Sequence, residues 1–238
     1  MVVRCVDLHI HTTFSDGSLS PAQVVRTAKE RKIAAVGITD HDTMEGVAAA
    51  QTAGQRYDVE VVPGLELSTN KGEKNFHLLG YYCDPHNKRL KNLLEQMAAG
   101  RHQRMKKMIA KLKEMGMEVD PAVILAQTKG QAPGRPHLAL ELCRKGYCST
   151  PAEAFTRFIG RGCPAYTQRF KLDLFEAIDL VRKAGGIPVL AHPGIYGEDS
   201  VIPEMVAKGL MGIEVFHPDH RPADEDNYKL LAKKYKLL

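Results

Sequence analysis

Two histidines near the start of the chain stand two positions apart, and a carboxylate follows them closely. His9 and His11 form an H-x-H pattern, and Asp16 lies in the stretch FSDG. In an extended strand, side chains two positions apart project to the same side, so both imidazoles can reach one cation. Imidazole and carboxylate ligands suit zinc, manganese or iron, whereas sites made only of oxygen ligands suit magnesium or calcium. The pattern therefore indicates a transition-metal site.

Further residues of this kind occur where expected strands end. They are Asp40 and His41 in TDHD, Glu66 in PGLELS, His77 in NFHLLGYY and His192 in AHPG. One such residue alone is more often structural, but their recurrence favours a shared site, because the carboxyl ends of parallel barrel strands meet at one mouth. We expect Asp40 to support catalysis by orienting a ligand. The expected metal ligands are His9, His11, Asp16, His41, Glu66, His77 and His192.

Short apolar runs alternate with helical patterns over most of the chain. Strands are expected over Cys5–His9, Ile33–Thr39, Glu60–Val62, Phe76–Tyr81, Ile187–Ala191 and Gly212–Phe216, and helices over Met44–Arg56 and Asp173–Lys183. Another helix is expected to begin after Ser20, with proline at its first position and Gln23 completing a capping box. This alternation predicts the α/β class, with parallel βαβ units around a barrel.

The middle of the chain breaks this alternation, because it shows helical patterns only. A capping box, for example, marks a helix start at Thr150. We therefore predict a helical insertion over residues 87–161, lying as a lid over one end of a barrel built from residues 1–86 and 162–238.

Composition describes an ordinary globular protein of 238 residues, 44% hydrophobic and 26% charged, with a formal net charge of +5. No apolar run approaches the roughly 20 residues that span a bilayer, and the N-terminus reads as a strand rather than a signal peptide, so we expect a cytoplasmic protein. The five scattered cysteines favour reduced thiols. Basic residues concentrate in Lys88–Lys113. We expect this segment to be either a solvated helix face or a basic lid that attracts phosphates. Neither a G-x-S-x-G elbow nor a P-loop is present.

The strings DLHIHTTFSDGSLSP, GITDHDT, PGLELS, FHLLGYY and AGGIPVLAHPG resemble the polymerase and histidinol phosphatase (PHP) family, in family order. The chain looks most like its stand-alone phosphoesterases, which remove the 3′-phosphate from nucleoside 3′,5′-bisphosphates or trim the 5′ ends of short RNA. The resemblance implies a distorted seven-stranded (β/α) TIM-like barrel with two or three divalent metal ions, commonly manganese, iron or zinc.

The resemblance also implies roles for individual residues. The ligands of one metal match His9, His11 and Glu66, those of a second match Asp16 and His41, and those of a third match Glu66, His77 and His192. The segment GRPHLA, with Arg135 and His137, resembles the contribution of the insertion to phosphate binding.

One departure from the family concerns a late Asp-x-His motif, which completes the first two metal positions. The sequence given ends in AKKYKLL without it, and His217 and His220 in FHPDH come earlier and in a different context. We expect either that this sequence is a shortened form or that water or another residue fills the two positions. A catalytically impaired PHP module is the corresponding alternative.

The expected reaction is hydrolysis of a small nucleotide phosphomonoester by a hydroxide that bridges two cations. Arg135 is expected to clamp a phosphate and His137 or His217 to protonate the leaving group, while Arg169 is a candidate for a second phosphate. Structural roles remain open for each of these residues. A histidinol-phosphate-type phosphatase and an exonuclease on short RNA or DNA ends are alternatives. No membrane partner is expected, and the sequence leaves the oligomeric state open.

Overall fold

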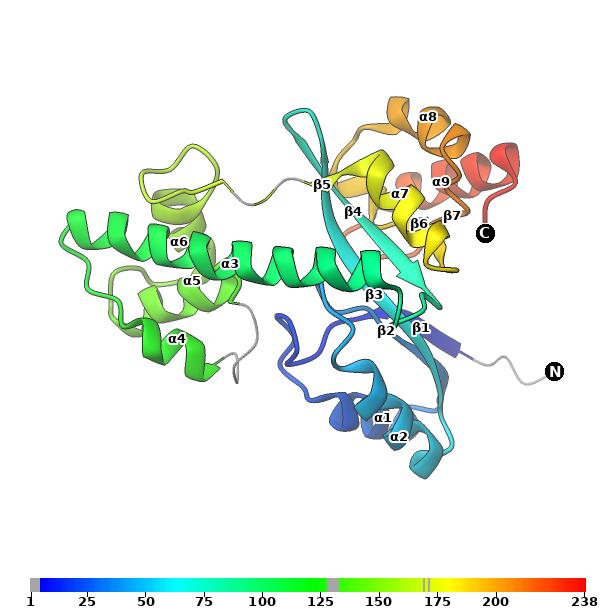
Figure 1. Ribbon diagram of the computed structural model, residues 1–238, viewed down its shortest axis with the longest axis horizontal. Helices are drawn as coiled ribbons and strands as arrows, with labels where there is room; N and C mark the ends of the chain where they lie inside the picture. Colours follow the sequence, from blue (N-terminus) through cyan, green and yellow to red (C-terminus); the bar gives the residue numbers. More distant parts are fainter. Residues whose placement is uncertain (1–4, 128–132, 169, 171) are drawn as a thin grey trace.

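The computed structural model describes residues 5–127, 133–168, 170 and 172–238, and Figure 1 shows a curled sheet with helices around it and a helical lobe to one side. The sheet order is β1 (Cys5–Ile10), β2 (Ile33–Ile38), β3 (Glu60–Lys71), β4 (Lys74–Tyr81), β6 (Ile187–Leu190) and β7 (Gly212–Ile213), with β5 (Leu172–Asp173) paired to β3. Within the described ranges, β1 and β7 are the two edges of this order. The strands therefore form a curled mixed sheet, and no closed seven-stranded barrel is seen among them.

The sheet is mixed, which differs from the parallel arrangement expected from the sequence. The β1–β2, β2–β3 and β6–β7 pairs are parallel, but β3–β4 and β4–β6 are antiparallel. Only Gly72 and Glu73 separate β3 from β4, and Gly72 has a φ of 59°. A two-residue turn joins antiparallel strands, whereas a parallel crossover needs about a dozen residues. The expected strand over Glu60–Val62 thus continues to Lys71, because β3 pairs with β2 first and with β4 afterwards.

Two helices cover the first strands of the sheet. These are α1 (Pro21–Glu30) and α2 (Val47–Tyr57), which enclose a hydrophobic cluster that includes Val25, Val36 and Ile38. The predicted capping box is present at the start of α1, where Gln23 N donates to Ser20 Oγ and Ser20 N donates to Gln23 Oε1.

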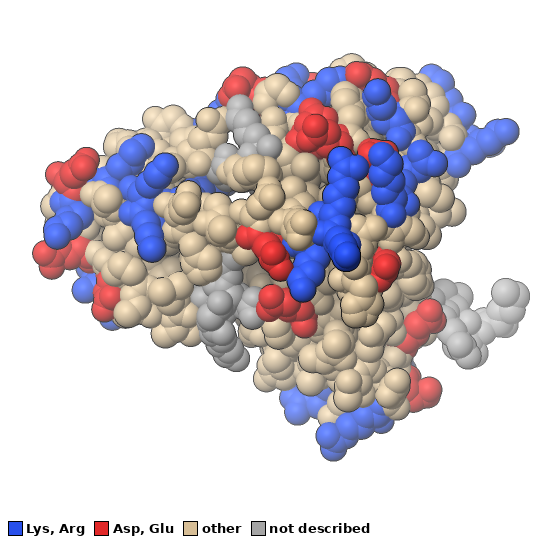
Figure 2. Space-filling view, in the orientation of Figure 1, with Lys and Arg blue, Asp and Glu red and all other residues tan. Residues whose placement is uncertain are grey.

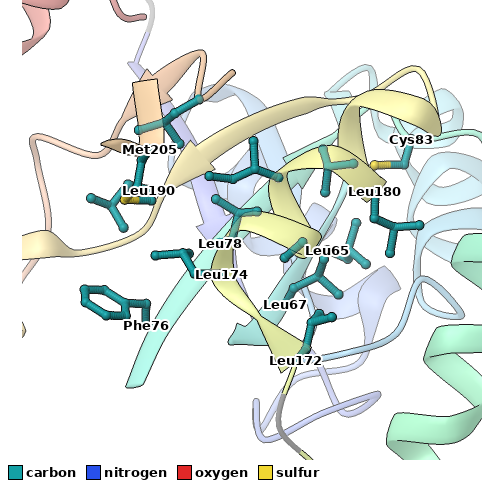
Figure 3. Close-up of a cluster of buried hydrophobic side chains, with 14 of the residues drawn as sticks. Leu65, Leu67, Phe76, Leu78, Cys83, Leu172, Leu174, Leu180, Leu190 and Met205 are labelled. Atoms are coloured by element: carbon teal, nitrogen blue, oxygen red, sulfur yellow. The ribbon is translucent and has the colours of Figure 1, made fainter. Parts of the chain in front are cut away.

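The largest hydrophobic cluster lies between the sheet and α7 (Leu174–Lys183), as Figure 3 shows. Successive strand residues alternate between two faces, so Leu65, Leu67 and Leu78 are fully buried in this cluster. Each such side chain stabilises the fold by about 1.5–3 kcal/mol. The residues between them, Glu66 and Ser68, point to the opposite face, so this cluster fixes the direction in which Glu66 projects.

The helical lobe is built from α3 (Lys88–Glu114), α4 (Pro121–Gln127), α5 (Arg135–Arg144) and α6 (Pro151–Ala154), followed by a π-helical turn over Phe155–Ile159. It has its own hydrophobic cluster, which includes Met108, Leu112 and Leu138. Leu90 and Met97 of the same long helix α3 belong to the cluster under the sheet. The helix therefore connects two hydrophobic cores.

The last helices are α8 (Ile202–Ala207) and α9 (Pro222–Tyr235), which lie near β6 and β7 in Figure 1. Tyr228 of α9 is buried in the cluster under the sheet. Among the described residues, no helix is both long enough and apolar enough to cross a bilayer.

Candidate active site

The carboxylate of Glu66 lies at the centre of a group of imidazoles. It is 1% exposed, and its Oε1 is 2.9 Å from both His77 Nδ1 and His192 Nε2. Its Oε2 is 2.9 Å from His41 Nδ1 and 3.0 Å from His11 Nε2. The sequence pattern predicts that Glu66 lies just after a strand, but Glu66 lies within β3. The antiparallel neighbour β4 places His77 beside Glu66.

The end of β1 contributes two further imidazoles. The Nε2 atoms of His9 and His11 face each other at 3.2 Å, and His9 Nε2 is 3.5 Å from Glu66 Oε2. On its other side, His11 Nδ1 is 2.8 Å from Asp16 Oδ1. The loop returns so closely that a Cβ at Gly17 would lie 2.2 Å from the His11 carbonyl oxygen, so this position requires glycine.

The ends of β2 and β6 position the remaining histidines. His41 follows β2 and forms an isolated parallel bridge with Glu66, and its Nε2 is 3.8 Å from Asp16 Oδ2. His192 follows β6 and has a φ of 28°, a conformation that residues other than glycine rarely adopt. Such strained backbone positions are concentrated at functional sites. The five histidines expected as metal ligands therefore lie around the carboxylate of Glu66, and Asp16 contacts two of them from outside.

Asp40 lies behind this group and holds the loop after β1. It is 1% exposed, and its carboxylate accepts hydrogen bonds from Thr12 N, Thr12 Oγ1 and Ser15 Oγ at 2.6–2.7 Å. The loop that it fixes carries Asp16, one of the expected ligands. This geometry fits an orienting role for Asp40.

The donor set fits divalent cations. Two ligands that each lie about 2.1 Å from one cation are separated from each other by about 3–3.4 Å, and the nitrogen–oxygen separations around Glu66 are 2.9–3.5 Å. Buried Glu66 Oε2 and His41 Nδ1 lie 2.9 Å apart but have no partner in hydrogen-bond geometry. Two electron-pair donors that lie this close together without a hydrogen bond are suited to bind the same cation. Among the described residues, the ligand atoms of four groups lie close enough to hold a metal ion. These groups are His9–Glu66–His192, His11–Asp16–His41, His41–Glu66–His77 and His9–Glu214–His217.

Protonation in the absence of cations follows from the same contacts. Burial lowers the pKa of His9, but the hydrogen bond to Glu214 and the nearby charge of Glu66 outweigh it and raise the pKa to about 9. Burial also opposes the shift of His11, whose contacts with Asp16 and Glu66 raise the pKa to about 10. Burial tends to raise the pKa of Glu66, but the surrounding histidines hold it well below its usual range. Protons therefore occupy His9 and His11 near neutral pH until a cation displaces them.

A cavity of about 780 Å³ opens from this group toward the helical lobe. Asp16 and His41 line one end, and Arg101, Arg104 and Arg135 line the lobe side. Apolar lining residues include Phe14, Met44, Leu94, Met97, Phe155 and Phe170.

The arginines of the cavity are held by contacts with residues of the lobe and of the sheet region. Arg135 lies over the ring of Phe155, 5.2 Å from its centroid, and burial lowers the pKa of its guanidinium. Arg104 Nε donates to the Thr167 carbonyl at 2.8 Å. Arg101 of α3 forms an ion pair with buried Asp42, the residue after His41. Sequence reasoning missed Arg101, because nothing in a helical pattern indicates which basic residue faces a distant site.

The expected proton donors lie in different surroundings. The ring of His217 is 5.9 Å from that of His9 and 5.2 Å from that of His192. Burial lowers the pKa of His217. His137 Nδ1 accepts a hydrogen bond from Gly134 N at 3.1 Å, and burial lowers its pKa as well. Of these two, His217 lies beside the expected ligands, whereas His137 caps the start of α5. Arg169 lies outside the described residues.

Glu214 is a residue of this site that sequence reasoning missed. It directly follows β7, and its Oε1 is 2.9 Å from His9 Nδ1. Burial tends to raise its pKa, but the hydrogen bond and charge of His9 lower it. The sequence carried a signal for this residue. Glu214 lies within GIEVF near the end of a strand, as the expected metal ligands do.

Charged side chains on one face of the molecule are mixed. Figure 2 shows that lysine and arginine gather toward both ends of α3, with acidic groups between and around them. Four lysine and arginine residues of this helix, Lys88, Lys91, Arg101 and Arg104, line the cavity. The positive charge relevant to an anion is therefore local to the cavity rather than spread over a continuous surface.

Comparisons with known proteins agree with this site. A family model described as PHP domain matches residues 7–103. The chain is 34% identical over 238 residues to the phosphoribosyl 1,2-cyclic phosphate 1,2-diphosphodiesterase of Eggerthella lenta, covering 98% of this chain and 90% of that protein. It is 30% identical over 239 residues to the 3′,5′-nucleoside bisphosphate phosphatase of Chromobacterium violaceum, covering 98% and 84%.

The fold is also found among solved structures. A protein from Bifidobacterium adolescentis, provisionally described as a metal-dependent phosphoesterase, superimposes with a TM-score of 0.92 at 29% identity, over 99% of this chain and 85% of that one. Together with the carboxylate–imidazole group around Glu66, these relationships show that the chain belongs to the PHP family of metal-dependent phosphoesterases.

Proposed function

We propose that this phosphoesterase hydrolyses a phosphomonoester of a small nucleotide, such as a nucleoside 3′,5′-bisphosphate. The observation that carries the proposal is the cavity of about 780 Å³, which joins the candidate metal ligands to three arginines and several apolar side chains. Its volume is in the range of small-molecule sites, about 300–1,000 Å³. The relative from Chromobacterium violaceum is named for this reaction.

Glu66 and the six other expected ligands grouped near it are the proposed ligands of two or three manganese, iron or zinc ions. When bound, such cations supply an activated water and neutralise phosphoryl oxygens. Glu66 has two oxygens that face different histidines, so it is suited to join two positions. Hydrogen bonds from Thr12 and Ser15 to Asp40 keep the loop that carries Asp16 in place.

The helical segment 87–161 is proposed to form the substrate wall of the site. Arg135 presents a planar guanidinium that can bind two phosphate oxygens at once. The neighbouring apolar groups Phe14, Leu94 and Met97 offer a surface for a base or sugar. A substrate with both an apolar face and phosphates would therefore contact both parts of the cavity.

His217 is the proposed proton donor to the leaving oxygen. Its Nδ1 accepts a hydrogen bond from Asp219 N at 3.2 Å, so in the neutral ring Nε2 carries the proton. Its position beside His9 and His192 supports this role more directly than the position of His137 does. A His217→Gln variant should lower kcat for substrates with a poor leaving group while leaving metal content unchanged.

The test is hydrolysis of a nucleoside 3′,5′-bisphosphate after loading with manganese, iron or zinc, with released phosphate and bound metal measured together. Glu66→Ala and His9→Ala should lose both metal and turnover. Glu60→Ala is the matched control, because Glu60 lies exposed at the start of the same strand. Turnover that survives both ligand substitutions would overturn the proposal.

A phosphodiester is the second candidate substrate. The supporting observation is that the relative from Eggerthella lenta, which aligns over 90% of its length, is named as a diphosphodiesterase. A panel of nucleoside bisphosphates, cyclic phosphodiesters, short RNA and histidinol phosphate distinguishes the candidates. The monoester proposal fails if a diester is cleaved with the higher kcat/KM.

A further inference from the structure

Glu214 is a buried carboxylate whose two oxygens are used in different ways. Its side chain is 11% exposed. Oε1 accepts a hydrogen bond from His9 Nδ1 at 2.9 Å, and Oε2 accepts one from the backbone N–H of His192 at 2.6 Å. Its own backbone N–H donates to the Leu190 carbonyl at 2.9 Å, so the residue is fixed to the end of β6.

The contact with His9 determines which ring nitrogen faces the centre of the site. When Nδ1 carries the proton that is donated to Glu214, the lone pair of the neutral ring is on Nε2. That Nε2 lies 3.2 Å from His11 Nε2 and 3.5 Å from Glu66 Oε2. A carboxylate behind a ligating histidine in this way orients the ring and increases its basicity.

The contact with His192 fixes a second candidate ligand. The φ of 28° at His192 is strained for a residue with a side chain, and the hydrogen bond to Glu214 holds its N–H in that conformation. His9 lies in β1 and Glu214 directly follows β7, and these strands are the two edges of the described sheet order. One side chain therefore joins these edges at the site itself.

We propose that Glu214 is a positioning residue of the metal centre, which sets the tautomer of His9 and the backbone conformation of His192. The proposal rests on the ligand roles proposed above. Glu214, His9 and His217 could also share a cation directly. The present hydrogen bonds argue against this arrangement, because each Glu214 oxygen already accepts one, from His9 Nδ1 or from His192 N.

The test compares Glu214→Gln and Glu214→Ala with the full wild-type chain. Binding of Mn²⁺ is measured by calorimetry, and bound metal is counted by elemental analysis. Loss of such a supporting carboxylate typically weakens metal affinity about 10–100-fold. Glutamine keeps one acceptor oxygen for His9 but offers an amide N–H₂ toward the N–H of His192, so it should fall between wild type and alanine.

A second readout separates positioning from general structural support. In the Co²⁺-loaded protein, the visible ligand-field bands should shift in Glu214→Gln, while its metal-free form unfolds at the same temperature as wild type within a few degrees. His217→Ala should keep the full number of bound metals, whereas loss of one metal in both His217→Ala and Glu214→Gln would support direct ligation and overturn the proposal.

Measurements on wild type and on Glu214→Gln distinguish a wrong positioning role from a wrong proposed function. If wild type binds metal and releases phosphate, and Glu214→Gln binds Mn²⁺ equally tightly with unchanged Co²⁺ bands, the positioning role is wrong and the phosphoesterase assignment stands. If wild type itself takes up no cation, both are wrong.

Discussion

At the scale of single residues, the site is a set of charges that stabilise one another. One buried carboxylate, Glu66, is surrounded by five imidazoles, and Asp16 and Glu214 contact three of these rings from outside. Without cations, protons on His9 and His11 balance the carboxylates, and with cations those protons must leave. The pH dependence of stability therefore depends on metal loading.

The first prediction concerns the metal-free protein. His9 and His11 have pKa values raised from 6.5 to about 9 and about 10, so their contribution is fully present below about pH 6.5 and is lost as pH rises through these values. We expect the free energy of unfolding to fall between about pH 6.5 and pH 10 in urea titrations with a chelator. A stability that is constant over this range, or that rises, would contradict the assigned contacts.

Asp40 supports a second prediction at this scale. Asp40→Asn replaces one of two acceptor oxygens by a donor while Thr12 and Ser15 still present three donors. Leaving a buried donor without its acceptor costs about 1–3 kcal/mol. Chemical denaturation should show this loss, together with weaker binding of metal beside Asp16. Asp58→Asn, at an exposed position, is the control and should change neither quantity.

At the scale of elements, the site depends on strand pairing and on one long helix. The antiparallel pairing of β3 with β4 places Glu66 and His77 on the same face, while α3 extends Arg101 from the lobe to Asp42. Burial tends to raise the pKa of Asp42, but the charge of Arg101 outweighs it and lowers the value. The pair therefore joins the lobe to the residue next to His41.

Removing Arg101 tests this connection. Arg101→Met should destabilise the fold by about 3–5 kcal/mol, because Asp42 would be left as a buried, uncompensated charge. The double variant Arg101→Met with Asp42→Asn should recover part of that loss in thermal denaturation. Arg157→Met breaks an exposed pair with Glu153 and should change stability by less than about 1 kcal/mol. Equal effects of the two arginine substitutions would exclude a special role for the Arg101 pair.

At the scale of the whole molecule, two hydrophobic cores share one helix. Met97 of α3 is buried under the sheet, and Met108 of the same helix is buried in the lobe. The cavity beside Asp16 and His41 is lined by residues of both parts, so its shape requires that they keep a fixed relationship. A continuous helix of 27 residues supplies this rigidity.

This arrangement predicts cooperative unfolding. Met108→Ala should destabilise the protein by about 2–5 kcal/mol, and calorimetry should show one transition at a lower temperature rather than early melting of the lobe. Two separate transitions in the variant would show that the lobe folds independently of the sheet. Met115→Ala, at an exposed position near the end of the helix, is the control.

The sequence alone determined the family, and it predicted the histidines and carboxylates that the structure brings together around Glu66, except Glu214. The reason is physical, since ligand type and strand-end position are local properties of motifs such as H-x-H and TDHD. It also determined the α/β class and most element positions, because hydrophobic periodicity and capping are local. The orienting role of Asp40 stays a prediction, supported by its hydrogen bonds from Thr12 and Ser15.

Only the tertiary structure decided the features that depend on contacts between distant segments. These include the antiparallel β3–β4 pairing within a mixed sheet, the position of Glu66 inside a strand, the Arg101–Asp42 pair and the Glu214–His9 contact, whose partners are 205 positions apart. Such contacts depend on how strands and helices pack in space, and residue type and spacing along the chain carry no direct signal for them.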